Sequence, residues 1–366
     1  QRHKPFTMFK NLKNKSVKFL FGFLLTVILI GLSSSMDKSD QTNSKEGNWE
    51  GCLVGMYPEN GNEKIPGGNL HEIDDFEALT GQKVGSVVWF PPWDDEFPTL
   101  ACNKLAERGI IPPLTWELFW PSKDPNNSRQ TGPDGYQGFH DVLAGKYDDY
   151  IDRFAEDAKA FDKTVLMRFM HEFNGNWYVW SGNKNGGAEG GPDQVVAVWK
   201  YVVDRFRAKG ANNEKWLWVP HGPSTDRSEE PWNHVSKYWP GNDYVDWIGL
   251  DGYNFYPRDP WGGERPFRDF DNCFRKLYDD CAILGDQPMM IAEFGTGEFQ
   301  YKNLDKAAWI TDAFAKIKDE YPRVKIFTWF NINKELDWRV NSSPEALKAF
   351  KNAMKDPYYK GSPSAP

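Results

Sequence analysis

The chain has 366 residues, of which 40% are apolar and 26% charged, a composition that suits a globular protein with a sizeable core and excludes a largely disordered chain. Its net charge of -8 argues against nucleic acid and anionic membranes as partners. With 17 Trp, 15 Tyr and 25 Phe, it holds more aromatic rings than core filling normally requires. We therefore expect some of these rings to have a binding role.

The beginning of the chain is typical of a targeting segment. Basic residues precede the apolar stretch Phe19–Leu32, and the small residues Ser33–Ser35 follow it. We predict a signal peptide or leader over 1–35 and a secreted, monomeric protein; an uncleaved membrane anchor is the alternative, although the stretch is shorter than the roughly 20 residues that span a bilayer. Loss of 1–35 would remove six basic and no acidic side chains, which changes the net charge from -8 to -14. A neutral substrate is the expected partner.

The four cysteines do not form a metal-binding pattern. Their spacing contains no CxxC, which argues against zinc. In an exported protein they permit three disulfide pairings, but a core of this size does not need them. The four residues are Cys52, Cys102, Cys273 and Cys281.

A polar linker over 36–48 is followed by apolar runs that alternate with helical patterns. Spacings of three and four predict helices over 147–161, over 195–206 with an end near Gly210, and over 309–317 with an end before Pro322. A last helix should begin at Ser343, with Pro344 in its first position. Eight apolar runs are predicted strands: 52–57, 85–90, 110–116, 164–171, 215–220, 244–254, 288–294 and 325–331.

Strands that are apolar on both faces and alternate with helices belong to a parallel sheet, and eight such repeats close a barrel. The predicted fold class is α/β, a single (β/α)8 TIM barrel over 49–358 followed by a flexible tail over 359–366. A doubly wound open sheet is the alternative. No GxGxxG fingerprint follows the first strand, which argues against it.

Functional residues of such a barrel lie at the carboxyl ends of its strands. Polar residues and tryptophans occur together there, and this combination suits sugar rings, which stack on indole while their hydroxyls bind polar groups. The polar candidates are Asp94, Glu117, His171, Glu172, Asp251, Tyr253, Glu293 and Asp337, and the aromatic ones are Trp93, Trp116, Trp120, Trp177, Trp180, Trp261 and Trp329.

Glu172 and Glu293, at the ends of the fourth and seventh predicted strands, are the best candidates for catalysis. Two carboxylates about 5 to 5.5 Å apart across a glycosidic bond perform retaining hydrolysis, one as nucleophile and the other as acid and base. We expect the pKa of the acid, Glu172, to be raised by apolar neighbours such as Trp177 and by the charge of Glu293. Tyr253 has the same strand parity as Asp251, so that both should face the site and the hydroxyl can hold the nucleophile.

Structural roles are the alternative for each of these residues. A strand-end Glu can belong to an ion pair, here with Arg168, and His171 can be a satisfied core histidine. Tyr253 and Asp251 can be barrel packing. The same holds for Trp116, Trp120 and Trp261, which can pack in loops or in the core.

The sequence lacks the motifs of other classes of hydrolase. The run that begins at His171 starts like HExxH, but Gly175 stands where the second histidine belongs. No spacing collects His140, His221 and His234 around a metal. No GxSxG elbow of an α/β-hydrolase occurs. We therefore expect neither a metal nor a cofactor.

At two motifs the sequence resembles glycoside hydrolase family 26, which contains many secreted β-mannanases. "RFMHEFNGNWYVW" (168–180) is similar to that family's acid/base segment and "MIAEFG" (290–295) to its nucleophile segment, and the likeness extends from Leu53 to about Ser343. The resemblance implies Glu172 as acid/base, Glu293 as nucleophile and Tyr253 as the nucleophile's hydrogen-bond partner. It implies sugar contacts by His171, Trp177 and Trp329, and it implies no metal.

The predicted function is a secreted retaining endo-β-glycanase that hydrolyses β-1,4-mannan or glucomannan of plant or algal origin. A mixed-linkage β-1,3-1,4-glucanase or β-1,3-xylanase of the same family is the alternative, because Phe173 stands where mannanases of the family often carry Met. A barrel that binds glycans without cleaving them is a second alternative. Two opposed carboxylates argue against this last interpretation, since binding alone does not need them.

Overall fold

The computed structural model describes residues 50–58, 70–119, 138–222, 230–258 and 263–362, all within one compact unit, Glu46–Pro366. The predicted leader and linker, and two of the candidate tryptophans, Trp120 and Trp261, lie outside the described residues. No helix in the described part of the chain is both long and apolar enough to span a bilayer.

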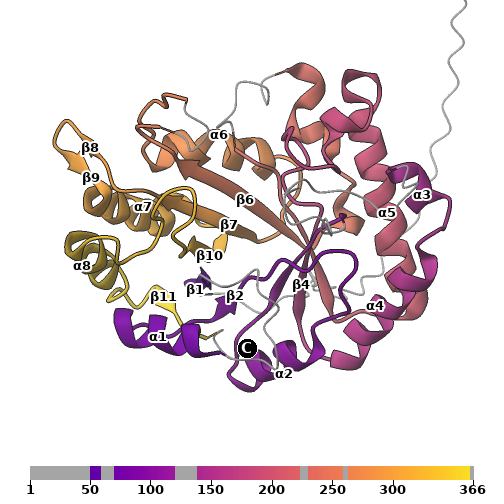
Figure 1. Cartoon of the computed structure of the whole chain (residues 1–366), viewed down its shortest axis with the longest axis horizontal. Helices are drawn as coiled ribbons and strands as arrows, with labels where there is room; N and C mark the ends of the chain where they lie inside the picture. The colour runs from indigo at the N-terminus through magenta and orange to yellow at the C-terminus, as the bar shows by residue number, and fades with distance from the viewer. Residues whose placement is uncertain (1–49, 59–69, 120–137, 223–229, 259–262, 363–366) are drawn as a thin grey trace, which may run out of the picture. The chain divides into compact units, whose positions relative to one another are not determined.

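Eight parallel strands form a barrel, as predicted (Figure 1). Neighbouring strands pair in the order β1, β2, β3, β4, β5, β6, β7, β10 and back to β1; between β2 and β3 the pairing consists of isolated bridges such as Ser86 to Ile111. The strands are β1 Cys52–Tyr57, β2 Ser86–Val87, β3 Pro113–Trp116, β4 Val165–Phe169, β5 Glu214–Trp218, β6 Trp247–Asn254, β7 Met289–Thr296 and β10 Val324–Phe330.

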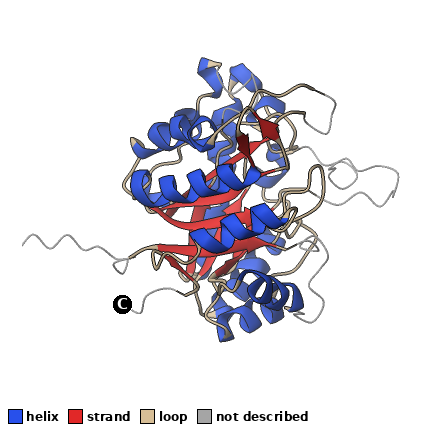
Figure 2. Ribbon diagram, turned by 90° about the vertical axis from the view of Figure 1, so that its left-hand side faces the viewer, coloured by secondary structure: helices blue, strands red, loops and turns tan. Residues whose placement is uncertain are grey.

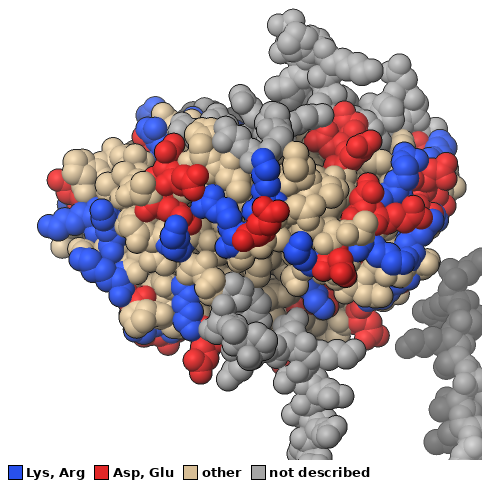
Figure 3. All heavy atoms as spheres, turned by 90° about the horizontal axis from the view of Figure 1, so that it is seen from below, with Lys and Arg blue, Asp and Glu red and all other residues tan. Residues whose placement is uncertain are grey.

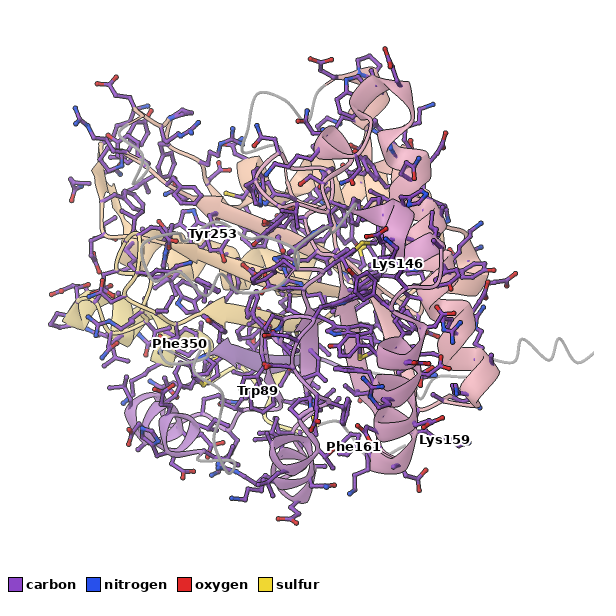
Figure 4. The ribbon with its side chains drawn as sticks, turned by 45° about the vertical axis from the view of Figure 1, so that its right-hand side comes forward. Trp89, Lys146, Lys159, Phe161, Tyr253 and Phe350 are labelled. Carbon is purple, nitrogen blue, oxygen red and sulfur yellow. The ribbon has the colours of Figure 1, made fainter. Side chains whose placement is uncertain are left out.

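Helices cover the outside of the strands (Figure 2). Helix α4 carries an apolar stripe of residues three and four apart, from Ile151 to Phe161, that is buried against the barrel. Figure 4 shows Lys159 and Phe161 at the end of this helix, outside the strands. The helices are α1 His71–Thr80, α2 Thr99–Glu107, α3 Phe139–Leu143, α4 Asp148–Phe161, α5 Gly191–Lys209, α6 Phe270–Ala282, α7 Lys306–Glu320 and α8 Pro344–Ala353.

The predicted helix ends agree with the structure. Helix α5 ends at Lys209, and Gly210 follows it in the left-handed conformation that glycine adopts without strain. Helix α8 begins at Pro344, and the hydroxyl of Ser343 accepts a hydrogen bond from the Ala346 N–H at its N-terminus. These boundaries depend on local chemistry, which is why the sequence predicts them well.

The connection from β5 to β6 departs from the regular repeat. Its described residues form three short 3-10 turns in place of an α-helix, η3 Pro231–Asn233, η4 Val235–Tyr238 and η5 Asn242–Tyr244; residues 223–229 lie outside the description. The other short elements are η1 Gly182–Lys184, η2 Gly187–Glu189, the hairpin β8 Gln300–Tyr301 with β9 Leu304–Asp305, and β11 Tyr359–Lys360.

The end of the barrel lies further along the chain than predicted. Tyr359 and Lys360 form β11, which pairs with the first residues of β1, and the Tyr359 ring is buried. The tail expected from 359 therefore cannot begin before residue 361.

Two apolar layers hold the barrel together. One layer fills its interior with side chains from alternate positions of the strands, among them Leu53, Leu166, Met290 and Ile326. The larger layer lies between the strands and the helices. All four cysteines are free and buried, so that no disulfide contributes to the described fold.

The surface carries both signs of charge. On the face shown in Figure 3, acidic and basic side chains are interspersed. In the described chain, opposite charges form pairs such as Arg205 with Asp152 and Lys318 with Asp356. Such a mixed surface offers no extended basic patch to a polyanion on this face.

Candidate active site

Arg168 is the centre of a buried polar cluster at the carboxyl end of the barrel. It lies in β4 two residues after Leu166, so its side chain points into the barrel, where it is fully buried. Its guanidinium donates to Glu293 Oε1 at 2.5 Å, to Thr115 Oγ1 at 3.0 Å and to Asp251. Arg168 thus pairs with the carboxylates of β6 and β7, and the ion pair suggested as an alternative for a strand-end Glu is present at Glu293.

Glu293 enters this cluster because β7 is irregular. The register of β7 shifts against both β6 and β10 next to Glu293, where two consecutive β7 residues, Ala292 and Glu293, face the barrel interior. Such a bulge redirects one side chain to the other face of a strand. Tyr253 donates to Glu293 Oε2 at 2.6 Å, so both carboxylate oxygens are held. The predicted hydrogen bond between Tyr253 and Glu293 is therefore present.

Tyr253 is a donor in this contact at all ordinary pH values. Burial and the negative charge of Glu293 raise the pKa of Tyr253 well above its usual range, so the phenol keeps its proton. Tyr253 lies over the strands in Figure 4, and its ring packs against Trp338. Asp251, on the same face of β6, has a raised pKa because burial and the charges of Glu293 and Glu172 outweigh the attraction of Arg168.

Glu172 follows β4 in a strained backbone conformation. Its φ of 52° is unusual for a residue with a side chain, and it persists where surrounding contacts impose it. Here the Glu172 N–H donates to Val219 O at 2.7 Å. The carboxylate is held at both oxygens, by Trp177 Nε1 at 2.8 Å and by His221 Nδ1 at 2.7 Å.

The pKa of Glu172 contradicts our expectation. Burial raises it, but the charge and hydrogen bond of His221, the charge of Arg168 and the hydrogen bond from Trp177 together outweigh burial and leave it lowered. Trp177 had been expected to act as an apolar neighbour. It acts through its N–H instead.

The Asn-Gly pair in this segment has a packing role. A Cβ on Gly175 would lie 2.6 Å from the Trp177 ring, closer than real contacts allow, so only glycine lets the indole fold back toward Glu172. The Asn174 side chain binds both backbone groups of His221. Phe173, noted as a departure from the mannanase pattern, is fully buried between Trp218 and Tyr238 and has a packing role.

Two of the predicted sugar-binding tryptophans are core residues. Trp329 is fully buried, donates to Trp338 O at 2.8 Å and packs against Phe294 on the outer side of the barrel. Trp116 is also fully buried, and its ring stacks on Phe154 of α4 at 4.3 Å. The prediction is wrong for both, because each lies on the face of its strand that points toward the helices. Trp93 and Trp180 are buried as well.

His171 also lies deeper than predicted. It is 1% exposed, binds Tyr178 OH through Nε2 at 2.9 Å and packs against the rings of Phe90 and Trp180. Burial and the charges of Arg168 and His221 lower its pKa well below the usual range, so the imidazole is neutral. This environment fits the alternative of a packed core histidine.

Some aromatic rings around the carboxylates remain partly exposed. Phe90 lies over the Arg168 guanidinium, Phe255 packs on Trp338, and Trp177 and Tyr178 lie beside Glu172 and His171. Of the candidate tryptophans that the structure describes, only Trp177 keeps part of its surface exposed at the site. Its role as a sugar contact stays a prediction, and the same is true of Trp120 and Trp261.

The remaining polar candidates divide into two groups. Glu117 is buried near the cluster, and its pKa is raised well above the usual range, chiefly by burial and partly by the charges of Glu293 and Glu172, against the pull of Arg168. Asp337 forms an ion pair with Arg339, and Asp94 is exposed. In the described part of the chain, no group of three or more His, Cys, Asp or Glu side chains could hold a metal ion.

The comparisons with known proteins identify the family. Residues 139–263, which include the segment around Glu172, match the model of "Glycosyl hydrolase family 26". Endoglucanase H of Acetivibrio thermocellus is 32% identical over 339 residues, which is 92% of this chain and 33% of the relative. The chain belongs to glycosyl hydrolase family 26.

Relatives within the family have different names. Mannan endo-1,4-beta-mannosidase A and B of Caldalkalibacillus mannanilyticus is 27% identical over 51% of this chain and 32% of its own length. The chain thus spans about a third of the length of these two relatives. The catalytic domain of a family 26 endo-beta-1,4-mannanase from Bacillus sp. JAMB-750 has the same fold, with a TM-score of 0.60 at 18% identity over 84% of this chain and 87% of that one.

We expect the ion pairs of Arg168 to contribute to the unfolding free energy of the protein. Replacing it with methionine would leave the carboxylates of Glu293 and Asp251 buried without their cation, which typically costs about 3–5 kcal/mol of unfolding free energy. Ionised carboxylates cause this cost, so the variant should regain stability as the pH falls and they become protonated. Urea unfolding of Arg168→Met and wild type at pH 5 and pH 8 measures it; a pH-independent difference would contradict the charge argument.

Proposed function

We propose that this family 26 member is a retaining endo-β-glycanase in which Glu293 is the nucleophile and Glu172 the acid/base. The observation that supports this most strongly is the pair of strand-end carboxyl groups, each 6% exposed and each held at both oxygens by hydrogen-bonding side chains. Four hydrogen-bonding partners, two for each carboxyl group, orient the two groups before substrate binds. Such preorganisation is what catalysis needs, and glycan binding alone does not require it.

In the first step, Glu293 attacks the anomeric carbon while Glu172 gives its proton to the departing glycosidic oxygen. In the second step, Glu172 takes a proton from water, whose oxygen attacks the same carbon and releases Glu293. Tyr253 and Arg168 keep the nucleophile in position through both steps. The partly exposed rings of Trp177, Tyr178 and Phe255 offer flat apolar surfaces to the sugar.

For the substrate, the comparisons favour a β-glucan over the β-1,4-mannan predicted from the motifs. The relative named endoglucanase aligns with 92% of this chain, and the relative named mannan endo-1,4-beta-mannosidase with 51%. Mannan or glucomannan remains the second candidate, supported by relatives of that name from three bacteria. A shorter alignment, 32% of this chain, links it to a beta-1,3-xylanase of Vibrio sp..

A reducing-sugar assay on barley mixed-linkage glucan, mannan, glucomannan and β-1,3-xylan tests the proposal. We expect release from barley glucan at least about tenfold faster than from mannan, since one misplaced hydroxyl commonly costs that much or more. Glu293→Ala serves as the inactive control. Faster release from mannan would favour β-1,4-mannan, the substrate predicted from the motifs. Binding without release of sugar from any of the four polysaccharides would favour a glycan-binding barrel.

A further inference from the structure

The contact between His221 and Glu172 joins two titratable side chains and can therefore do more than orient the carboxylate. His221 follows β5, is 6% exposed and lies with Nδ1 2.7 Å from Glu172 Oε1. At this distance one of the two groups donates a hydrogen bond to the other, and such a bond is strengthened when either group is charged. The sequence indicates His221 only as a member of a metal cluster, which its spacing does not support.

Hydrogen bonds and a ring contact from the segment after Glu172 fix the position of His221. The Asn174 side chain accepts from the His221 N–H at 2.8 Å and donates to its carbonyl at 2.9 Å. Asn174 is itself buried, and its carbonyl accepts from Asn233 in the turn η3. The Trp177 ring meets the imidazole edge-on, with centroids 5.0 Å apart. The segment after Glu172 thus holds both the carboxylate's tryptophan donor and its histidine partner.

Charged and titratable groups from several strands lie near this pair. Arg168 of β4 contributes a positive charge, and Glu293 of β7 and Asp251 of β6 carry carboxyl groups. Glu117, after β3, adds a fourth carboxyl group, and His171, Tyr178 and Tyr253 are uncharged. Among the described residues named here, four carboxyl groups, including that of Glu172 itself, lie around the Arg168 guanidinium. A proton held on the pair reduces this excess of negative charge.

We propose that Glu172 and His221 hold the catalytic proton as one pair, with His221 as a positioning residue that keeps the pair protonated in the neutral pH range. The proposal rests on the acid/base role proposed for Glu172. Glu172 Oε passes the proton to the glycosidic oxygen as the C–O bond breaks, and His221 touches no substrate. When water attacks in the second step, its proton returns to Glu172 and restores the pair.

When two titratable groups interact strongly, the apparent pKa at which the last proton leaves is a property of the pair and not of either group. An isolated imidazole titrates about two pH units above an isolated carboxyl group. The pair therefore retains one proton to higher pH than a carboxyl group alone. A glutamate whose pKa is lowered in the free protein can then receive a proton from its histidine partner when it acts as the acid.

The test is the pH profile of kcat/KM for His221→Asn on the polysaccharide that the wild-type full chain hydrolyses. The Asn amide can still donate to Glu172 but cannot hold a second proton. We expect the alkaline limb to move by at least about one pH unit toward acid. His234→Asn, at a surface histidine that pairs with Asp280, is the matched control and should leave the profile unchanged. An unmoved limb in a folded His221→Asn would overturn the proposal.

A second measurement keeps His221 in place and follows the titration of the Glu172 carboxyl group by NMR. In protein labelled with 13C at the glutamate carboxyl carbons, the Glu172 resonance is assigned by its loss in Glu172→Gln. We expect this resonance to titrate with a component between about pH 6 and 8, in the imidazole range. A single step below pH 5 would overturn the shared proton. Failure of the wild type to hydrolyse any β-glycan would instead contradict the proposed function and leave this titration valid.

Discussion

Glu293→Ala should abolish hydrolysis, with kcat reduced on the order of 10⁴-fold or more, while polysaccharide binding stays nearly intact. Without the carboxylate no glycosyl-enzyme forms, and loss of a nucleophile commonly has an effect of this size. The bound sugar loses few contacts, because Glu293 is 6% exposed and mostly contacts Arg168 and Tyr253. Single-turnover assays and affinity electrophoresis on the polysaccharide measure the two effects separately. Normal turnover would exclude the nucleophile role.

Sodium azide distinguishes this role from a structural one. In Glu293→Ala, azide can enter the vacated space and attack the anomeric carbon directly, which gives a glycosyl azide of inverted configuration. Rescue requires an activated leaving group such as dinitrophenolate. Glu293→Gln is the matched variant, because it keeps the shape of the side chain and leaves no space for azide. An azide product of retained configuration would assign Glu293 the acid/base role instead.

Glu172→Ala should lose about 10²–10⁴-fold in kcat/KM on polysaccharide and much less on aryl glycosides with good leaving groups. A natural sugar leaves as an alkoxide unless it is protonated, whereas an activated phenolate leaves without a proton. Trp177 and His221 lose their hydrogen-bond partner in this variant, so circular dichroism must show that the fold is kept. Kinetics with a series of aryl glycosides measure the dependence on leaving-group pKa. Equal losses on both substrate types would contradict the acid role.

The relative rates of glycosyl-enzyme formation and hydrolysis provide a further control for Glu172→Ala. With activated substrates the glycosyl-enzyme should form quickly but be released slowly, because water lacks its general base. A burst of phenolate followed by a slow steady state is therefore expected. Added azide should accelerate release and yield a product of retained configuration.

Much of the fold and the two central residues could be predicted from local sequence patterns. Apolar runs such as 52–57 and helix signals such as Ser343 followed by Pro344 depend on neighbouring residues alone, and the structure places these elements where they were predicted. Because carboxyl ends of barrel strands share one face, the sequence also indicates that Glu172 and Glu293 belong to the same end.

The environment of these residues could not be predicted, because it depends on which side of a strand each residue faces. Strict alternation would direct Glu293 away from the barrel, and only the irregular register of β7 returns it to the interior. Trp116 and Trp329 lie near the carboxyl ends of β3 and β10, yet the ring of each packs against a helix. Composition and spacing contain no sign of either outcome.

By itself, the sequence determined the strand and helix order, the barrel they close and the two glutamates at its carboxyl end, since these follow from periodicity and local chemistry. Only the tertiary structure decided which donors reach those glutamates. His221 is 49 residues from Glu172 along the chain, and their 2.7 Å contact exists because β4 and β5 pair side by side in the barrel. A carboxyl group's pKa depends on charges and donors within a few ångströms, and that neighbourhood is assembled only by folding.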